Sequence, residues 1–313
     1  MQRNFFQIDY KNNYAISFTY YSFVYLNQGI IYIFVETLYI IFDMRTLSFF
    51  FATFITLSCM TFASCNTKTK PIDESPEWIQ LLSEDNLEDW TVKITNYEVG
   101  DNYANTFSME DGILKVRYDE EAYPTFENRF GHLFYKDTFS HYILRLEYRF
   151  VGDQCPGAPG WAFRNSGIMF HGQSPESMAL DQDFPVSIEY QLLGSDSTRE
   201  QVTGSVCTPG TNIVINDELI LDHCIQSSSD TYMDDQWVTA ELEVRGNEIV
   251  KHIINGDTVM VYSQPQLDER EQYYQKVLEL NNGEQMLSRG TISLQSEGHP
   301  CDFRNVEIKV LKE

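Results

Sequence analysis

The fold is decided by residues 185–193, which read Pro-Val-Ser-Ile-Glu-Tyr-Gln-Leu-Leu. Three apolar residues alternate here: Ile188, Tyr190 and Leu192. Three polar residues stand between them: Ser187, Glu189 and Gln191. Successive side chains of a strand point to opposite faces of the sheet, so one face meets a core while the other carries a carboxylate beside an amide. Any half-solvated antiparallel strand alternates in this way, so a functional interpretation needs further strands that add reactive groups.

Three other stretches repeat the alternation with chemically capable side chains. Residues 167–171 put His171 opposite Ile168 and Phe170. Residues 291–300 put Gln295 and Glu297 on the polar side, with His299 in the Gly/Pro bend that follows. Residues 144–150 alternate Arg145, Glu147 and Arg149 with apolar residues. We therefore expect one sheet face to collect acids, amides, imidazoles and guanidinium groups.

Alternating runs recur through most of the chain. They cover residues 90–94, 112–116, 132–135, 142–151, 167–171, 186–193, 237–244, 249–254, 258–262, 290–295 and 303–311. Turn pairs separate them, and the pair Asn255 and Gly256 is the strongest hairpin signal. Helical periodicity is confined to residues 77–82 and 268–280. This pattern predicts an all-β fold, a jelly-roll sandwich of two antiparallel sheets in a single domain at residues 78–313.

The N-terminal part has the composition of an export signal. Residues 44–64 contain a basic start, an apolar run and small residues before Cys65, which is the order of a secretory signal peptide. The small residues before Cys65 resemble a bacterial lipobox, so we expect Cys65 to be lipidated. A transmembrane helix is the weaker alternative, because the apolar run is short.

The flanking segments complete this prediction. Residues 1–43 are either an upstream membrane segment or an extension before the true start at Met44, and we favour the second. Residues 65–77, which contain Pro71 and Pro76, are expected to tether the lipidated cysteine to the domain. The predicted location is the bacterial cell envelope, anchored in the outer membrane on its periplasmic or surface side.

The formal net charge is −24. Removing residues 1–64 leaves it unchanged, because they hold three Lys or Arg and three Asp or Glu. So acidic a surface repels phosphate backbones and anionic lipid headgroups. We therefore expect no nucleic-acid partner and membrane contact only through the anchor. Neutral sugars, cations and basic proteins remain as partners.

Four cysteines remain after the signal segment and Cys65 are set aside, an even number in an exported domain. Three connectivities are open. Cys207 and Cys224 flank a turn-rich excursion and are the favoured pair, which leaves Cys155 with Cys301. A zinc site is the competing interpretation, but no pair has Cys-x-x-Cys spacing.

Several enzyme signatures are absent from the sequence, including the Gly-x-Ser-x-Gly elbow, the phosphate loop and His-Glu-x-x-His. Another set of motifs occurs in order: Asn-Ser-Gly-Ile at 165–168, Val-Ser-Ile-Glu-Tyr-Gln at 186–191, Thr-Gly at 203–204, Gln-Trp at 236–237, Ile-Asn-Gly at 254–256, Ile-Ser-Leu-Gln at 292–295 and Phe-Arg-Asn at 303–305. From about residue 81 to the C-terminus, the chain resembles the 3-keto-disaccharide hydrolase family. The resemblance implies a concanavalin-like jelly roll.

The resemblance also implies a chemistry. A ketone at C3 of a sugar acidifies the hydrogen on C2, so a base can remove it and expel the glycosidic oxygen from C1. Water then adds to the enone, which gives net hydrolysis. The reaction needs a base, a proton donor for the leaving oxygen, and donors or a cation for the enolate. His, Glu, Arg and a divalent metal ion are groups that could fill these roles.

Residue roles follow from matching this sequence to the family motifs. Glu189 and Gln191 match the Glu-x-Gln strand, and Gln295 ends the Ile-x-Leu-Gln strand. Glu189 is predicted to position substrate or a metal ion, and His171 or His299 to carry the proton, although many relatives have Arg where this chain has His171. The predicted substrate-binding residues are Arg164, Asn165, Gln191, Gln295, Glu297 and Arg304.

Three classes of function remain open on the sequence alone. The first is an exported enzyme that cleaves 3-keto-glycosides, favoured by the His- and Glu-rich face. The second is a non-catalytic glycan-binding module, for which Trp161, Tyr190 and Trp237 could form an aromatic platform. The third is a purely structural envelope lipoprotein. A jelly roll hosts all of them, so the geometry of the site must decide.

Overall fold

The computed structural model describes residues 15–23, 33–41, 77–83 and 85–312. The chain divides into two compact units, residues 1–72 and 73–313. In the first unit, β1 (Ala15–Phe23) and β2 (Ile33–Ile41) pair antiparallel. The expected signal peptide at 44–64, Cys65 and nearly all of the tether lie outside the described residues. Within the described part of the chain, no helix is long and apolar enough to cross a membrane.

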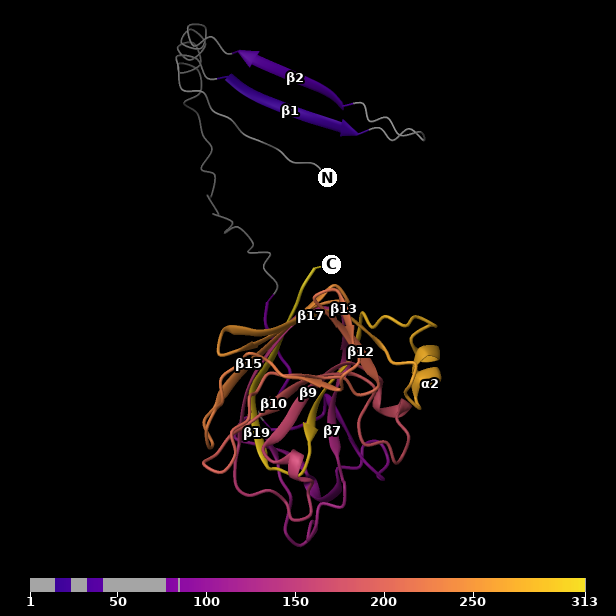
Figure 1. The fold of residues 1–313 in the computed structure, drawn as a ribbon. Helices are drawn as coiled ribbons and strands as arrows, with labels where there is room; N and C mark the ends of the chain where they lie inside the picture. The colour runs from indigo at the N-terminus through magenta and orange to yellow at the C-terminus, as the bar shows by residue number, and fades with distance from the viewer. Residues whose placement is uncertain (1–14, 24–32, 42–76, 84, 313) are drawn as a thin grey trace, which may run out of the picture. The chain divides into compact units, whose positions relative to one another are not determined.

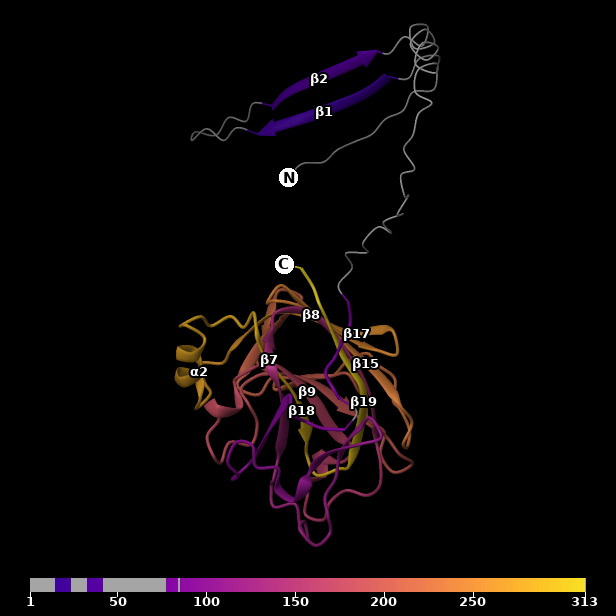
Figure 2. The same ribbon diagram turned by 180° about the vertical axis from the view of Figure 1, so that it is seen from behind.

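The second unit is a sandwich of two antiparallel sheets (Figure 1). The seven-stranded sheet has the order β14 (Cys224–Ile225), β11 (Val206–Cys207), β10 (Ile188–Leu193), β9 (Asn165–Gly172), β18 (Gly290–Ser296), β7 (Gly131–Phe139) and β4 (Trp90–Ile94). Strands distant in sequence thus lie side by side, as Figure 2 shows for β7, β9 and β18.

The ten-stranded sheet has the order β13 (Glu218–Ile220), β12 (Thr211–Ile215), β17 (Asp257–Leu267), β16 (Ile249–Ile254), β15 (Val238–Arg245), β8 (His141–Phe150), β19 (Cys301–Val310), β6 (Ile113–Val116) and β5 (Phe107–Glu110), with β3 (Ile79–Gln80) paired to β19. The helical elements are α2 (Tyr274–Leu280) and the 3-10 turns η1 (Tyr103–Asn105), η2 (Gly160–Ala162) and η3 (Pro175–Ser177). This architecture confirms the predicted all-β jelly roll.

Strand β10 shows how alternation builds the core between the sheets. Ile188, Tyr190 and Leu192 are fully buried there. The Tyr190 ring stacks on His252 of β16 with centroids 3.9 Å apart, and its hydroxyl donates to the Ile253 carbonyl at 2.9 Å. Burying each large apolar side chain contributes about 1.5–3 kcal/mol. The register of β10 is therefore fixed, and Glu189 is held on the opposite face.

The predicted hairpin at Asn255 and Gly256 is confirmed. These residues join β16 to β17 and have φ angles of 49° and 92°. Left-handed φ at both central positions matches the turn to the twist of the strands, and Asn and Gly adopt it at low cost.

Both helix predictions were wrong in whole or in part, and three short strands were not predicted. Residues 77–82 form no helix, since Ile79–Gln80 pairs with β19 instead. The helix expected at 268–280 is limited to Tyr274–Leu280. The strands β11, β13 and β14 were missed because two or three residues show no measurable period.

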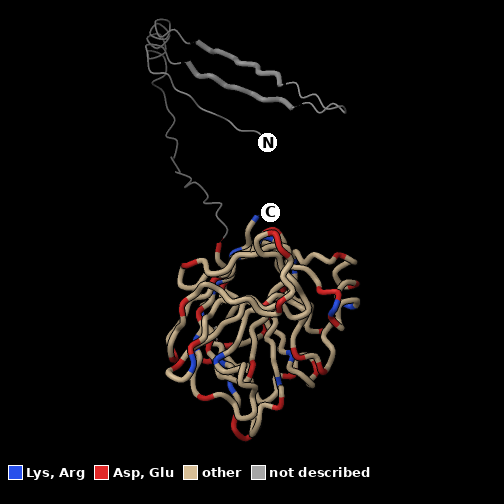
Figure 3. Tube along the Cα trace, viewed as in Figure 1, with Lys and Arg blue, Asp and Glu red and all other residues tan. Residues whose placement is uncertain are grey.

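The polar residues of β8 do not share a face with Glu189, because β8 belongs to the ten-stranded sheet. Arg145 pairs with Glu307, Arg149 with Asp302, and Glu147 with Arg304. Acidic residues are spread over many loops of the sandwich (Figure 3). They outnumber Lys and Arg in the chain, whose net charge is −24.

The disulfide prediction is confirmed for one pair and wrong for the other. Cys207 and Cys224 are bonded, with an S–S distance of 2.07 Å. Cys155 and Cys301 are both free and buried. Their side chains lie in separate apolar clusters, Cys155 among loop aromatics such as Tyr123 and Phe126, and Cys301 in the core between the sheets. An even cysteine count therefore does not imply complete pairing here.

Candidate functional site

A cavity of about 440 Å³ lies on the face of the seven-stranded sheet that points away from the core. We call it the central cavity. Its polar lining includes Glu189 and Gln191 from β10, Asn165 at the start of β9, and Glu297 immediately after β18. Four predicted residues from three separate stretches of sequence therefore meet in one place.

The central feature is a pair of buried carboxyl groups. Glu189 is 6% exposed and Glu297 is 2% exposed. Burial raises the pKa of Glu189, and the neighbouring Gln295 amide opposes that rise. Burial also raises the pKa of Glu297 well above its ordinary value, and the charge of Glu189 raises it further. Two such groups cannot both ionise readily, so the pair retains a proton near neutral pH.

A glycine makes room for this arrangement. A Cβ atom on Gly167 of β9 would clash with Gln295 Oε1 and would lie 2.9 Å from Glu189 Oε1. The missing side chain lets the amide and the carboxyl lie against the strand backbone from either side. Gly167 thus belongs to the site as well as to the strand.

Several buried polar atoms around the pair have no hydrogen-bond partner within the described residues. They include both side-chain atoms of Gln295, Asn165 Oδ1, Glu297 Oε2, Ser293 Oγ and both ring nitrogens of His132. Buried polar groups in native proteins are nearly always satisfied, by protein atoms, water or a ligand. Of these residues, Asn165 and Glu297 line the central cavity, so their oxygens without a partner lie where a polyhydroxylated ligand could bind.

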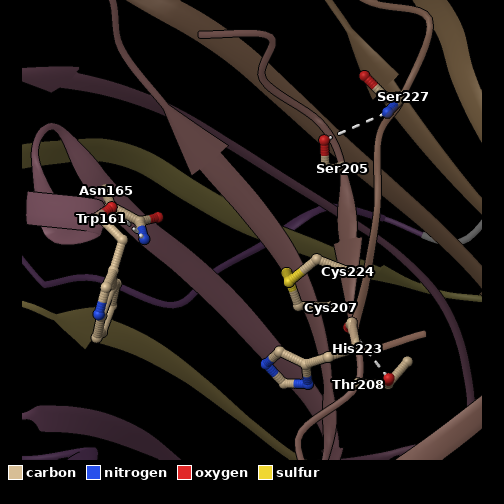
Figure 4. Close-up of a disulfide and its surroundings, with 8 residues drawn as sticks. All are labelled: Trp161, Asn165, Ser205, Cys207, Thr208, His223, Cys224 and Ser227. Carbon is tan, nitrogen blue, oxygen red and sulfur yellow. Dashed lines mark hydrogen bonds between the residues drawn. A yellow bond between two sulfur atoms is a disulfide. The ribbon is translucent and has the colours of Figure 1, made fainter. Parts of the chain in front are cut away.

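Aromatic and sulfur-containing groups line the sides of the central cavity. Trp161 is 49% exposed and stacks on Phe130 with ring centroids 5.6 Å apart. The Cys207–Cys224 disulfide and His223 line the same cavity. Figure 4 shows the disulfide next to the His223 imidazole, with the Trp161 indole apart from both at the left of the view. Cys207 pairs directly with Glu189 across β10 and β11, so the disulfide lies beside the acid pair.

His171 does not reach the central cavity, which corrects the predicted face. Its φ of 49° breaks the strand alternation, and its Nε2 lies 3.0 Å from the Gly246 carbonyl in the β15–β16 turn of the other sheet. Burial, only partly opposed by that carbonyl, lowers the pKa of His171 to about 4. The ring is therefore neutral and serves as a contact between the sheets.

His299 is also outside the lining of the central cavity. Its ring lies edge-on between Phe150 and Phe163, at centroid distances of 5.7 Å and 5.3 Å. Burial, helped by the charge of Arg164, lowers the pKa of His299 to about 4. Neither of the histidines that the sequence favoured as proton carriers therefore lines the cavity that contains the carboxyl pair.

The two arginines assigned to substrate lie elsewhere as well. Arg164 donates from Nη1 to the Asp234 carbonyl at 2.6 Å and does not line the cavity. Arg304 belongs to β19, pairs with Glu147 and lies 4.0 Å above the Trp237 ring. The Trp237 ring is therefore covered by Arg304, and Tyr190 is buried in the core. Of the three aromatic residues of the predicted platform, Trp161 is the one that lines the cavity.

No complete metal site accompanies Glu189. Across residues 77–83 and 85–312, no group of three or more His, Cys, Asp or Glu side chains is placed to hold a metal ion. Glu189 and Glu297 form only a pair, so we derive no step through a metal.

Sequence reasoning gave no role to His223, Arg199, Gln201 or Phe184, all of which line the central cavity. They come from loops and from the ends of two-residue strands, where no periodicity marks a face. The adjacency of His223 to the disulfide cysteine Cys224 is the one signal that could have indicated it.

Replacing Glu297 with Gln is expected to stabilise the folded protein at alkaline pH. A buried carboxyl with a raised pKa binds a proton when folded and releases it when unfolded, so its contribution to stability is lost as pH rises above about 4.5. We expect the variant to gain about 2 kcal/mol at pH 8 and little at pH 4, measured by urea unfolding. Exposed Glu218→Gln is the matched control, and an equal gain at both pH values would refute the burial argument.

Residues 77–309 match the family described as "3-keto-alpha-glucoside-1,2-lyase-like domain". Together with the acid-lined cavity, the fold defines a carbohydrate-related jelly-roll protein. The match spans most of the chain, and the chain belongs to this family, which confirms the resemblance carried by its motifs. No curated protein sequence matches the chain.

The chain is also similar, at low sequence identity, to several solved structures. A candidate glycosyl hydrolase from Parabacteroides distasonis is 17% identical, with a TM-score of 0.44 over 75% of this chain and 100% of that one. A β-glucanase from Bacillus licheniformis is 12% identical, with a TM-score of 0.41 over 77% and 100%. The carbohydrate-binding module CBM66 from Bacillus subtilis is 10% identical, with a TM-score of 0.39 over 72% and 97%.

Proposed function

We propose that this protein is an exported enzyme that cleaves 3-keto-glycosides by elimination at C1–C2 followed by hydration. The observation that carries the proposal is the pair of buried carboxyl groups, Glu189 and Glu297, in one cavity. A pair that holds a single proton supplies one base and one acid, which are the two groups that this reaction needs. Because burial raises the pKa of Glu189 to about 8, we expect this state to be reached as the pH rises toward 8.

Glu189 is assigned as the base, because the Gln295 amide favours its ionised form. Glu297 is assigned as the acid, because the charge of Glu189 raises its pKa further. Glu189 removes the hydrogen from C2, and Glu297 gives its proton to the glycosidic oxygen as the C1–O bond breaks. This assignment replaces the histidine proton carrier expected from the sequence.

Hydration restores both groups. Glu297, now ionised, takes a proton from the water that adds to C1, and Glu189 returns its proton to C2. Each carboxyl thus ends in its starting state, and the net reaction consumes one water.

The deciding assay compares a 3-keto-disaccharide with the same disaccharide unoxidised. Cleavage of the keto sugar alone supports the proposal, since only the ketone acidifies the C2 hydrogen. Binding of glycans without cleavage of either sugar would favour the second candidate, a glycan-binding module, for which the exposed Trp161 indole is the specific observation.

Trp161→Ala is expected to raise KM about tenfold, a loss of roughly 1.4 kcal/mol, with kcat nearly unchanged. The indole is 49% exposed at the cavity wall and can stack on a sugar face. Trp161→Phe keeps a flat ring and should restore most of the loss. A fall in kcat with KM unchanged would instead place Trp161 in the chemical step.

Localisation is part of the proposal. We expect the mature protein to be lipid-anchored at Cys65, since small residues precede that cysteine at the end of the signal segment. Cys65→Ala should move the protein from the membrane fraction to the soluble fraction. Unchanged fractionation would end the anchor hypothesis.

A further inference from the structure

The Glu297 carboxyl is held in place by its backbone rather than by hydrogen bonds of its own. Its Oε2 atom is buried and has no hydrogen-bond partner within the described residues. Glu297 is the first residue after β18 and opens the short bend at 297–300 that leads to β19. We call this segment the 297–300 bend. The placement of the carboxyl beside Glu189 therefore depends on the contacts that fix this bend.

Gly298, the residue after Glu297, is the best-anchored position of the bend. Its N–H donates to the Tyr118 hydroxyl at 2.7 Å, and its carbonyl accepts from the Cys155 N–H at 2.7 Å. Its φ of 98° suits glycine, and a Cβ atom there would lie 2.7 Å from Ala158 Cβ. The bond from Cys155 joins two backbones, so Tyr118 supplies the side-chain contact at this position.

Tyr118 is itself firmly placed. It follows β6 in the ten-stranded sheet, and its ring packs edge-on against Tyr123 and Phe126, with centroids 5.2 Å and 5.8 Å apart. Burial, the main cause, raises the pKa of Tyr118 well above its ordinary value. The hydroxyl therefore remains neutral, and its oxygen stays a hydrogen-bond acceptor for the Gly298 N–H at every pH at which the carboxyl pair titrates.

Two ionisable groups interact with Glu297. The charge of Glu189 on β10 raises the pKa of Glu297, after burial as the main cause. The Cys301 thiol on β19 has a pKa raised to about 12, chiefly by burial and to a small extent by the charge of Glu297. The thiol is therefore neutral, and the distance between the two carboxyl groups sets how strongly they influence each other.

We propose that Tyr118 is the positioning residue for Glu297: by accepting the Gly298 N–H, it fixes the 297–300 bend and so holds the Glu297 carboxyl beside Glu189. Tyr118 does not line the central cavity, so it acts only through the bend. Its consequence for catalysis rests on the proposed function, in which Glu297 is the acid. The placement of the carboxyl does not depend on that function.

Tyr118→Phe removes the hydroxyl and keeps the ring. With the Gly298 N–H left without a partner, the bend loosens, and Glu297 becomes more hydrated and less coupled to Glu189. In protein labelled with carboxyl-¹³C glutamate, the Glu297 signal is the one missing from Glu297→Gln. We expect it to titrate lower in Tyr118→Phe than in wild type, by about half a pH unit or more. With a 3-keto-disaccharide, kcat should fall about tenfold and KM should change little.

Tyr123→Phe is the matched control. Tyr123 lies in the same aromatic cluster, but its hydroxyl contacts Thr106 Oγ1 at 2.6 Å rather than the bend. This variant should leave both the Glu297 titration and kcat as in wild type. An unchanged Glu297 titration in Tyr118→Phe, or an equal shift in both variants, overturns the positioning role whatever the activity.

The titration also separates this inference from the proposed function. A shift confined to Tyr118→Phe, without cleavage of either sugar by wild type, supports the positioning role and rejects the enzyme. The same shift with kcat unchanged supports the positioning role and rejects Glu297 as the acid.

Discussion

Glu189→Gln is expected to lower kcat on a 3-keto-disaccharide by about 100-fold or more, with a smaller change in KM. The substitution keeps the shape and hydrogen-bonding capacity of the side chain but removes its basicity, and positioned acid–base groups typically contribute at least that factor. Because Glu189 and Glu297 act as a pair, Glu297→Gln should cause a loss of similar size, and the double variant should be little worse than either single one.

Two histidine variants sharpen this prediction. His171 contacts the Gly246 carbonyl, and His299 lies between Phe150 and Phe163, so neither is placed to move a proton at the carboxyl pair. His171→Ala and His299→Ala, judged on correctly folded protein, should each retain far more activity than Glu189→Gln. A 100-fold loss of kcat in either histidine variant, with Glu189→Gln still active, would indicate that the histidine and not Glu189 carries the proton.

Removing the Cys207–Cys224 disulfide is expected to destabilise the protein by about 3 kcal/mol, the value for a closed loop of roughly this length. The two cysteines are 17 residues apart, and the strands that carry them, β11 and β14, have two residues each. For a domain of this size, the melting temperature should fall by about 6–12 °C. KM should also rise, because the bond holds His223 and the rim of β14 at the cavity.

The double variant Cys207→Ala/Cys224→Ala is measured beside wild type, each with and without dithiothreitol. The reductant should lower the melting temperature of wild type to that of the variant and leave the variant unchanged, since Cys155 and Cys301 are already free thiols. Equal melting temperatures for all four samples would show that the bond does not stabilise this edge of the sheet.

Much of the fold follows from short-range patterns. The alternation in residues 186–193 and in 249–254 places β10 and β16 correctly, and Asn255 with Gly256 places the turn after β16. These predictions succeed because pleat and turn chemistry depend only on neighbouring residues. The same reasoning fails at β11 and β14, where strands of two residues are stabilised by pairing rather than by their own pattern.

The candidate site was predicted only in part. Glu189, Gln191, Asn165 and Glu297 do meet, with Gln295 beside them. The sequence alternation places His171 on the same face as the polar residues of the site. In the structure its left-handed φ turns the side chain toward the other sheet instead. Local backbone strain of this kind depends on tertiary packing, here the close approach of Gly290 to the His171 backbone.

The sequence by itself determined the fold class, the family and the side of β10 on which Glu189 stands, because periodicity fixes the face of a strand. Only the tertiary structure decided which strands are neighbours and which loops cover them. In that arrangement Glu189 and Glu297 line one cavity together with the disulfide and Trp161. Arg304, which lies over Trp237, and both candidate histidines do not line this cavity. Sheet order is set by long-range burial, which alternation along one strand does not encode.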